Sequence, residues 1–115
     1  MKSNLIYLND ILSCIDKIFV YIGEVSEDDF VNSPGMANDA VLMNLVSIGE
    51  SCAKIPLEVR AKSQTIPWRK VIDLRNIAVH QYFEVDYQLI WNIVMKELVD
   101  LKREVTRLTR DPDLE

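Results

Sequence analysis

The chain has 115 residues, of which 49% are hydrophobic and 27% are charged. These values are typical of one globular domain and argue against a disordered protein. The formal net charge is −5, so nucleic-acid binding through a broadly basic surface is disfavoured, whereas a small basic cleft on an acidic body stays possible.

The first predicted helix spans residues 3–22, where apolar residues recur at alternating spacings of three and four. Its stripe consists of Leu5, Leu8, Leu12, Ile15, Phe19 and Ile22, and Ile11 and Ile18 widen it. Gly23 suits the C-terminal cap of this helix. Residues 26–30 predict a short helical turn with Ser26 as its N-cap, and residues 32–35 predict a loop.

A second helix is predicted over residues 37–54. Its apolar face contains Ala37, Val41, Leu45, Ile48, Cys52 and, just beyond, Ile55. A neighbouring line carries two carboxylates, Asp39 and Glu50. In one interpretation they support the site by pairing with Arg75, from the same chain or from a second subunit. In the other, Asp39 is simply near the helix start, where acidic residues are favoured, and Glu50 faces solvent. The pattern leaves both alternatives open.

The second half of the chain predicts a short helix over residues 56–62 and two longer ones. Pro67 opens the third long helix, and Asp86 caps the last, over residues 87–109. The core faces of these two helices contain Trp68, Val71, Leu74 and Ala78, and then Trp91, Val94, Leu98, Leu101, Val105 and Leu108. We expect residues 111–115 to be frayed.

Period-two alternation is absent over any long stretch, and the chain has only three glycines. The predicted fold is therefore all-α: an up-and-down four-helix bundle with one or two short extra helices, forming a single domain over residues 1–115. Cys14 and Cys52 lie on apolar faces without a CxxC spacing, so we interpret them as reduced core residues of a cytoplasmic protein. No apolar run approaches the ~20 residues of a membrane span, and polar residues interrupt any signal-peptide pattern near the N-terminus.

Chemistry-bearing residues concentrate in residues 75–83, which include the only histidine, His80. Arg75, Asn76 and Tyr82 accompany it. On a straight α-helix Asn76 and His80 share a face, whereas Arg75 and His80 lie about 140° apart. Arg75 and His80 therefore approach each other either because the long arginine swings round or because they meet across a subunit interface.

The pattern Arg75-Asn76-x-x-x-His80-x-Tyr82 resembles the Rx4HxY motif of HEPN-domain toxins of the HepT type. The likeness extends over roughly residues 5–108. Residues 39–50 resemble the family's mid-chain block, and residues 66–69 and 82–86 resemble the flanks of the motif. Met43 departs from the pattern, because many members carry a basic residue there, so no phosphate contact is expected from that position.

The resemblance implies a HEPN-like homodimer in which Arg75, His80 and Asn76 from two chains form a composite RNA cleft. It also implies the toxin of a type VII-like toxin–antitoxin pair. In such pairs an MNT-type nucleotidyltransferase antitoxin transfers AMP to the tyrosine that corresponds to Tyr82, and the added charge and bulk would repel RNA. Taken alone, His80 and Tyr82 are more often surface or packed residues than functional ones.

The residue types suit cleavage of an RNA phosphodiester. An imidazole can accept the 2′-OH proton or donate one to the leaving 5′-oxygen. Arg75 can hold the phosphate in a two-pronged contact, and Asn76 can bond the phosphate or orient the imidazole. No cofactor is required, and the sequence offers no convincing set of metal ligands. DNA is not an expected substrate because it lacks the 2′-OH.

Two other functions fit the same residues. One is a non-catalytic HEPN module that binds a nucleotidyltransferase partner or a nucleotide, which the acidic net charge favours slightly. The other is a purely structural helical interaction protein, in which Arg75 and His80 would point to solvent away from any interface. The intact motif favours the ribonuclease, and substitution of His80 discriminates between these functions.

Overall fold

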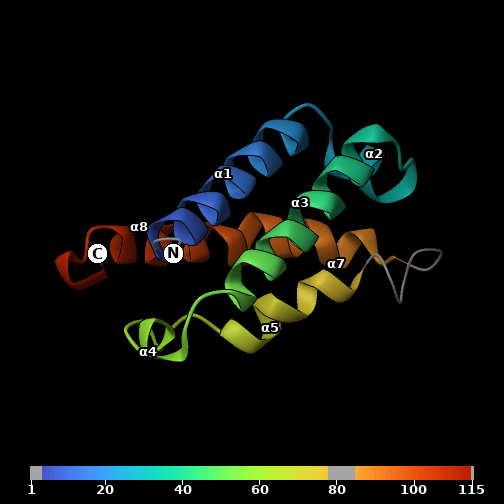
Figure 1. The fold of residues 1–115 in the computed structure, drawn as a ribbon. Coiled ribbons are helices and arrows are strands. Elements are labelled where there is room, and N and C mark those ends of the chain that lie inside the picture. Colours follow the sequence, from blue (N-terminus) through green and yellow to red (C-terminus); the bar gives the residue numbers. More distant parts are fainter. Residues whose placement is uncertain (1–3, 78–84, 115) are drawn as a thin grey trace.

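The computed structural model describes residues 4–77 and 85–114, and within these ranges every regular element is helical. The prediction of an all-α protein is confirmed (Figure 1). The elements are α1 (Asn4–Ile22), α2 (Glu27–Asn32), α3 (Met36–Ala53), α4 (Leu57–Arg60), α5 (Trp68–Asp73), η1 (Leu74–Asn76), α7 (Tyr87–Asn92), η2 (Ile93–Glu97), α8 (Leu98–Thr109) and η3 (Pro112–Leu114).

The core is built where α1 packs along α3 and α8 (Figure 1). On its other side α3 packs against α5 and η1, and α2 packs against α7. The long helices of the predicted bundle thus correspond to α1, to α3, to α5 with η1, and to the run from α7 to α8. The two short extra helices are α2 and α4, so the helix order expected from the sequence is confirmed.

The buried face of α1 is centred differently from the predicted stripe. Ile11 and Ile18, which were expected at its margin, are fully buried, whereas Leu5, Leu12 and Phe19 are only half-buried. Because α1 contacts both α3 and α8, its buried face is wide and its middle lies between these two neighbours.

The end of α1 is another correction. Gly23 directly follows the last residue of α1, as predicted, but it does not have the positive φ of a typical glycine cap. Instead the Gly23 N–H donates to the Phe19 carbonyl oxygen at 3.0 Å, and the chain leaves the helix through ordinary turns.

The two predicted N-caps are confirmed. The Ser26 Oγ accepts a hydrogen bond from the Asp29 N–H at 3.1 Å, and an Asp86 carboxylate oxygen accepts from the Leu89 N–H at 3.1 Å. Both caps satisfy N–H groups that have no partner inside their helix. The two short helices then meet through aromatic packing, because the buried Phe30 ring lies 5.5 Å from Tyr87 and 5.7 Å from Trp91 between ring centres.

The last helix runs from Tyr87 to Thr109 as predicted, but it contains a π-helical segment, η2. Its predicted stripe is buried from Val94 to Leu108, and Trp91 is half-buried. The expectation of a frayed end at residues 111–115 is wrong for η3. Leu114 is only 6% exposed, and a carboxylate oxygen of Asp111 accepts from the Asp113 N–H at 2.9 Å at the start of η3.

Both cysteines are free thiols, which agrees with the prediction. Cys52 is buried and Cys14 is half-buried. Burial raises the pKa of the Cys52 thiol to about 12, and burial is also the main cause that raises the pKa of Cys14. Across residues 4–77 and 85–114, none of the helices combines the length and apolar character that a membrane span needs.

Candidate active site

The motif begins on a tightened turn. The helix that starts after Pro67 is α-helical from Trp68 to Asp73 and then becomes the 3-10 helix η1, which carries Arg75 and Asn76. Successive residues of a 3-10 helix are about 120° apart rather than about 100°. The angle predicted for a straight α-helix therefore does not describe this turn, and short 3-10 stretches within a helix often mark strained or functional segments.

The start of α5 is anchored by hydrogen bonds from side chains to the backbone. The Trp68 indole N–H donates to the carbonyl oxygens of Arg60 and Ser63 at 3.1 and 2.9 Å. Arg60 in turn donates from one guanidinium nitrogen to the carbonyl oxygens of Cys52 and Ala53, at 3.3 and 3.1 Å. These contacts connect the end of α3 through α4 to α5, and they fix the element that leads to η1.

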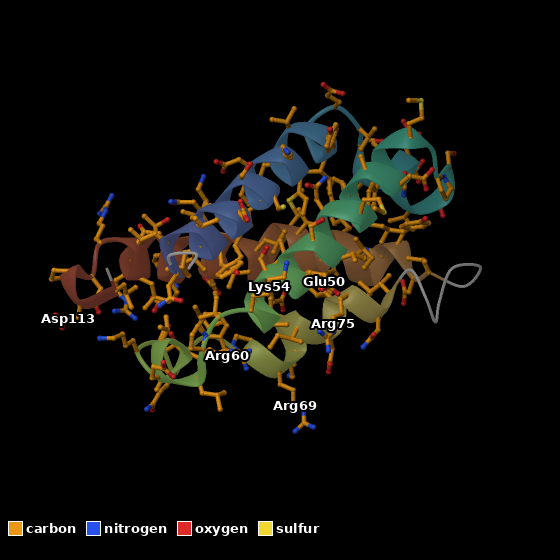
Figure 2. The ribbon with its side chains drawn as sticks, viewed as in Figure 1. Glu50, Lys54, Arg60, Arg69, Arg75 and Asp113 are labelled. Carbon is orange, nitrogen blue, oxygen red and sulfur yellow. The ribbon has the colours of Figure 1, made fainter. Side chains whose placement is uncertain are left out.

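Arg75 and Asn76 are both exposed on η1. Figure 2 shows Arg75 on this turn, beside α3. Within the described ranges the Arg75 side chain has no carboxylate at ion-pair distance. None of the described carboxylates therefore occupies its guanidinium, which carries five N–H donors in a planar fork.

The two carboxylates considered as supporting residues are also exposed. Asp39 lies in the first turn of α3, where a negative charge is favoured. Glu50 lies further along α3, close to η1 (Figure 2). Neither forms an ion pair with Arg75 in the described part of the chain. Among the described residues, Asp39 and Glu50 thus follow the alternative in which they face solvent. Their pairing with Arg75 of a second subunit stays a prediction.

His80 and Tyr82 lie outside the described residues, as does Ala78. The distance from Arg75 to His80, and with it the composition of the cleft, stays a prediction from the sequence. A groove of about 470 Å³ lies between α5 and α8, with Lys70, Leu74, Glu97 and Arg103 among its lining residues. Arg75 and Asn76 do not line this groove. In the segments that the structure describes, no group of three or more His, Cys, Asp or Glu side chains is arranged to hold a metal ion.

Comparison with known proteins identifies the family. A family model described as "Ribonuclease HepT-like" matches residues 11–108, a range that contains Arg75, Asn76, His80 and Tyr82. The chain belongs to the HepT-like family. The resemblance inferred from the motif and its flanks is thereby confirmed.

Three relatives of this HepT-like chain cover nearly all of it. It is 38% identical over 108 residues to a Methanocaldococcus jannaschii protein named "Gamma-glutamylcyclotransferase and putative RNase"; the match covers 94% of the chain and 48% of that relative. The chain thus spans about half of that relative's length. A "Putative RNase" of Caldanaerobacter subterraneus is 32% identical over 108 residues, with 94% of the chain and 96% of the relative covered.

The third relative, a "Probable ribonuclease HepT" of Thermococcus cleftensis, is 30% identical over 109 residues, with 95% of the chain and 98% of the relative covered. No solved structure matches the chain.

Proposed function

We propose that this HepT-like chain is a ribonuclease whose site contains Arg75, His80 and Asn76. The proposal depends on one observation. In this HepT-like chain Arg75 and Asn76 are exposed on η1, and none of the described carboxylates lies at ion-pair distance from Arg75. An arginine in this state keeps all its donors for a phosphate. The names of the relatives, which all contain RNase or ribonuclease, support the same activity.

The proposed reaction is transfer of the RNA phosphodiester to the neighbouring 2′-oxygen. A base removes the 2′-OH proton, the 2′-oxygen bonds to phosphorus, and the bond from phosphorus to the 5′-oxygen breaks. An acid donates a proton to that leaving oxygen, so the products are a 2′,3′-cyclic phosphate and a 5′-OH. His80 takes one of these two roles. If an imidazole also takes the other role, it has to come from a second copy, because the chain contains one histidine, and a two-fold dimer can supply it.

Arg75 and Asn76 act on charge and orientation in this scheme. The guanidinium holds the two non-bridging phosphate oxygens and offsets the negative charge that develops on them in the transition state. Asn76 donates to the phosphate or orients the imidazole. The route needs a 2′-OH and no metal step, so RNA and not DNA is the proposed substrate.

We also propose how the activity is regulated, and this part of the proposal rests on the family resemblance. The chain would act as the toxin of a two-gene pair, and an MNT-type nucleotidyltransferase would neutralise it by transferring AMP to Tyr82. The resemblance implies that the tyrosine corresponding to Tyr82 lies beside the cleft, so a phosphate attached to its oxygen would bring negative charge there. Like-charge repulsion and bulk would then exclude RNA.

The first experiment compares wild type with His80→Ala on induced expression at matched protein levels, with growth and new RNA ends as the readouts. Removing a general acid or base costs roughly 10²–10⁴-fold in rate, so only the wild type is expected to arrest growth and cut RNA. Equal behaviour of the two proteins would overturn the nuclease. The non-catalytic binding module, which the net charge of −5 favours, would then be the better interpretation.

Purified protein gives a second, chemical test. Cleavage of a short RNA is expected to persist in excess EDTA, and a 2′-deoxy substitution at the cut position is expected to abolish it, because the attacking oxygen is then missing. Loss of activity in EDTA would contradict the metal-independent route. Cleavage of the 2′-deoxy substrate would contradict the 2′-oxygen as the nucleophile.

A further inference from the structure

Gly49 lies in α3 one turn before its C-terminal end, buried against the turn that carries Arg75. A Cβ placed at Gly49 would lie 2.8 Å from the backbone nitrogen of Arg75, 2.9 Å from the carbonyl oxygen of Ile72 and 3.1 Å from that of Val71. All three are backbone atoms, which cannot turn aside as the end of a flexible side chain can. Any larger residue at this position therefore has to push the α5–η1 segment away from α3.

The other two glycines have no such neighbour. A Cβ at Gly35 would have no atom within 4 Å, and one at Gly23 would meet only the carbonyl oxygens of Phe19 and Val20 in α1, the helix that it follows. Helix propensity alone favours alanine over glycine in the interior of α3. The close contact with η1 supplies a packing reason for a glycine at this position of the helix.

We infer that Gly49 is a positioning residue for Arg75, which sets how closely η1 sits on α3 and thereby where the guanidinium stands. The inference rests on the proposed function, because it gives the close contact a role in cleavage. Arg75 is the residue whose nitrogen the contact reaches first, and Glu50, the next residue on α3, lies exposed beside the same turn. A misplacement of about 1 Å in a catalytic group can cost about 10²-fold in rate.

The test uses Gly49→Ala, Arg75→Ala, the double variant and Gly35→Ala as the matched control. Cleavage of one RNA is followed with enzyme in excess, so that slow variants remain measurable. We expect Gly49→Ala to lower the rate about 10- to 100-fold and Gly35→Ala to keep the wild-type rate. The double variant is expected to lose less than the product of the two single losses, because the position of an absent Arg75 side chain has no effect and only the shift of Asn76 on the same turn remains.

Two results would overturn the inference while leaving the nuclease intact. One is a wild-type rate for Gly49→Ala. The other is a double variant that loses the full factors of both single variants, because independent losses would place the effect of Gly49 elsewhere. Failure of the proposed function looks different, since wild-type protein itself would then not cleave RNA.

A folding control separates positioning from general damage. Amide NMR signals of residues 71–76 are expected to shift in Gly49→Ala while those of α8 stay in place, and Gly35→Ala should leave both sets unchanged. If Gly49→Ala is unfolded under the assay conditions, the comparison is repeated at low temperature in sucrose, which favours the compact state. A variant that stays unfolded there would assign Gly49 to the stability of the whole fold and overturn the specific role.

Discussion

The cations of α8 and those of α5 with η1 have opposite surroundings. All three cations of α8 are ion-paired: Lys102 with Asp16 at 2.9 Å, Arg103 with Asp100 at 3.2 Å and Arg107 with Glu104 at 3.3 Å. On α5 and η1, Arg69, Lys70 and Arg75 are exposed. None of these three has a carboxylate at ion-pair distance among the residues that the structure describes.

The cations of α8 are paired with carboxylates of the protein, whereas the cations of α5 and η1 have no described carboxylate partner and can contact a ligand. A carboxylate beside a cation occupies one of its donors and offsets its charge at short range, so a phosphate gains less there. On a chain with a net charge of −5, a polyanion approaches most readily where cations have no such partner. If RNA is the substrate, as proposed, the comparison favours η1 over α8 as the side that binds it.

Of the cations compared, Arg75 is expected to have the largest effect on RNA cleavage. Arg75→Ala should lower the kcat/KM of RNA cleavage about 10²–10³-fold, as expected for loss of a group that stabilises transition-state charge. Its free energy of unfolding should stay within about 0.5 kcal/mol of wild type, because the side chain is exposed. Cleavage assays and urea denaturation measure the two quantities.

Arg103→Ala on α8 is the matched control for Arg75. It removes the same side chain from a position 67% exposed and paired with Asp100, and cleavage should stay at the wild-type level. A similar loss of activity in both variants would mean that net positive charge, rather than the position of Arg75, supports cleavage.

Much of the fold was predictable because its determinants are local. The caps at Ser26 and Asp86 and the stripe of the last helix depend on residues within a few positions of one another. The centre of the α1 core face, at Ile11 and Ile18, depends on which helices lie alongside and could not be read from spacing. The same holds for Leu114, whose burial at 6% exposure results from tertiary packing of a segment with no periodic pattern.

For the candidate site the sequence predicts a set of residue types more than an arrangement, and the membership of His80 and Tyr82 stays a prediction. The motif located Arg75 and Asn76, and the structure shows both exposed, but the change from α-helix to η1 has no sequence signal as plain as a proline. Gly49 gave a signal that a pattern search passes over, an isolated glycine on a helix face. The proximity of its backbone to Arg75 becomes evident only in three dimensions.

A smaller effect is expected at Glu104, a structural carboxylate of α8. One of its oxygens accepts from the hydroxyls of Ser63 and Thr65, both at 3.1 Å, and from the Arg107 guanidinium at 3.3 Å. These hydrogen bonds, with that from Ser63 the largest cause, lower the pKa of Glu104 below its usual 4.5. The folded state therefore favours the charged form, and this stabilisation is present above pH 4.5 and is lost as the pH falls through the lowered pKa.

Glu104→Gln should accordingly show a smaller drop in melting temperature than wild type when the pH is lowered from neutrality to below 4.5. Thermal unfolding followed by circular dichroism at a series of pH values measures this. Glu24→Gln is the control, because Glu24 is exposed and makes none of these contacts; it should keep the wild-type pH dependence. An unchanged acid response in Glu104→Gln would show that the three hydrogen bonds do not contribute to folding stability.

The smallest effect is expected at Lys102, one of the ion-paired cations of α8, and it concerns folding stability. Its ammonium lies 2.9 Å from Asp16, with side chains 46% and 59% exposed, and 5.8 Å from the centre of the Phe19 ring. Exposed ion pairs contribute about 0–1 kcal/mol, so Lys102→Ala should lower the free energy of unfolding by at most about 1 kcal/mol, and less at high salt.

Lys102→Met retains the apolar stem over Phe19 and separates loss of packing from loss of charge. Urea denaturation at low and high salt measures stability, and RNA binding is measured in the same buffers. Because Asp16 already occupies the ammonium, both variants should bind RNA as wild type does, whereas Arg75→Ala should not. If RNA affinity fell as much for Lys102→Ala as for Arg75→Ala, ion pairing would not distinguish the two surfaces, and the RNA-binding side would have to include α8.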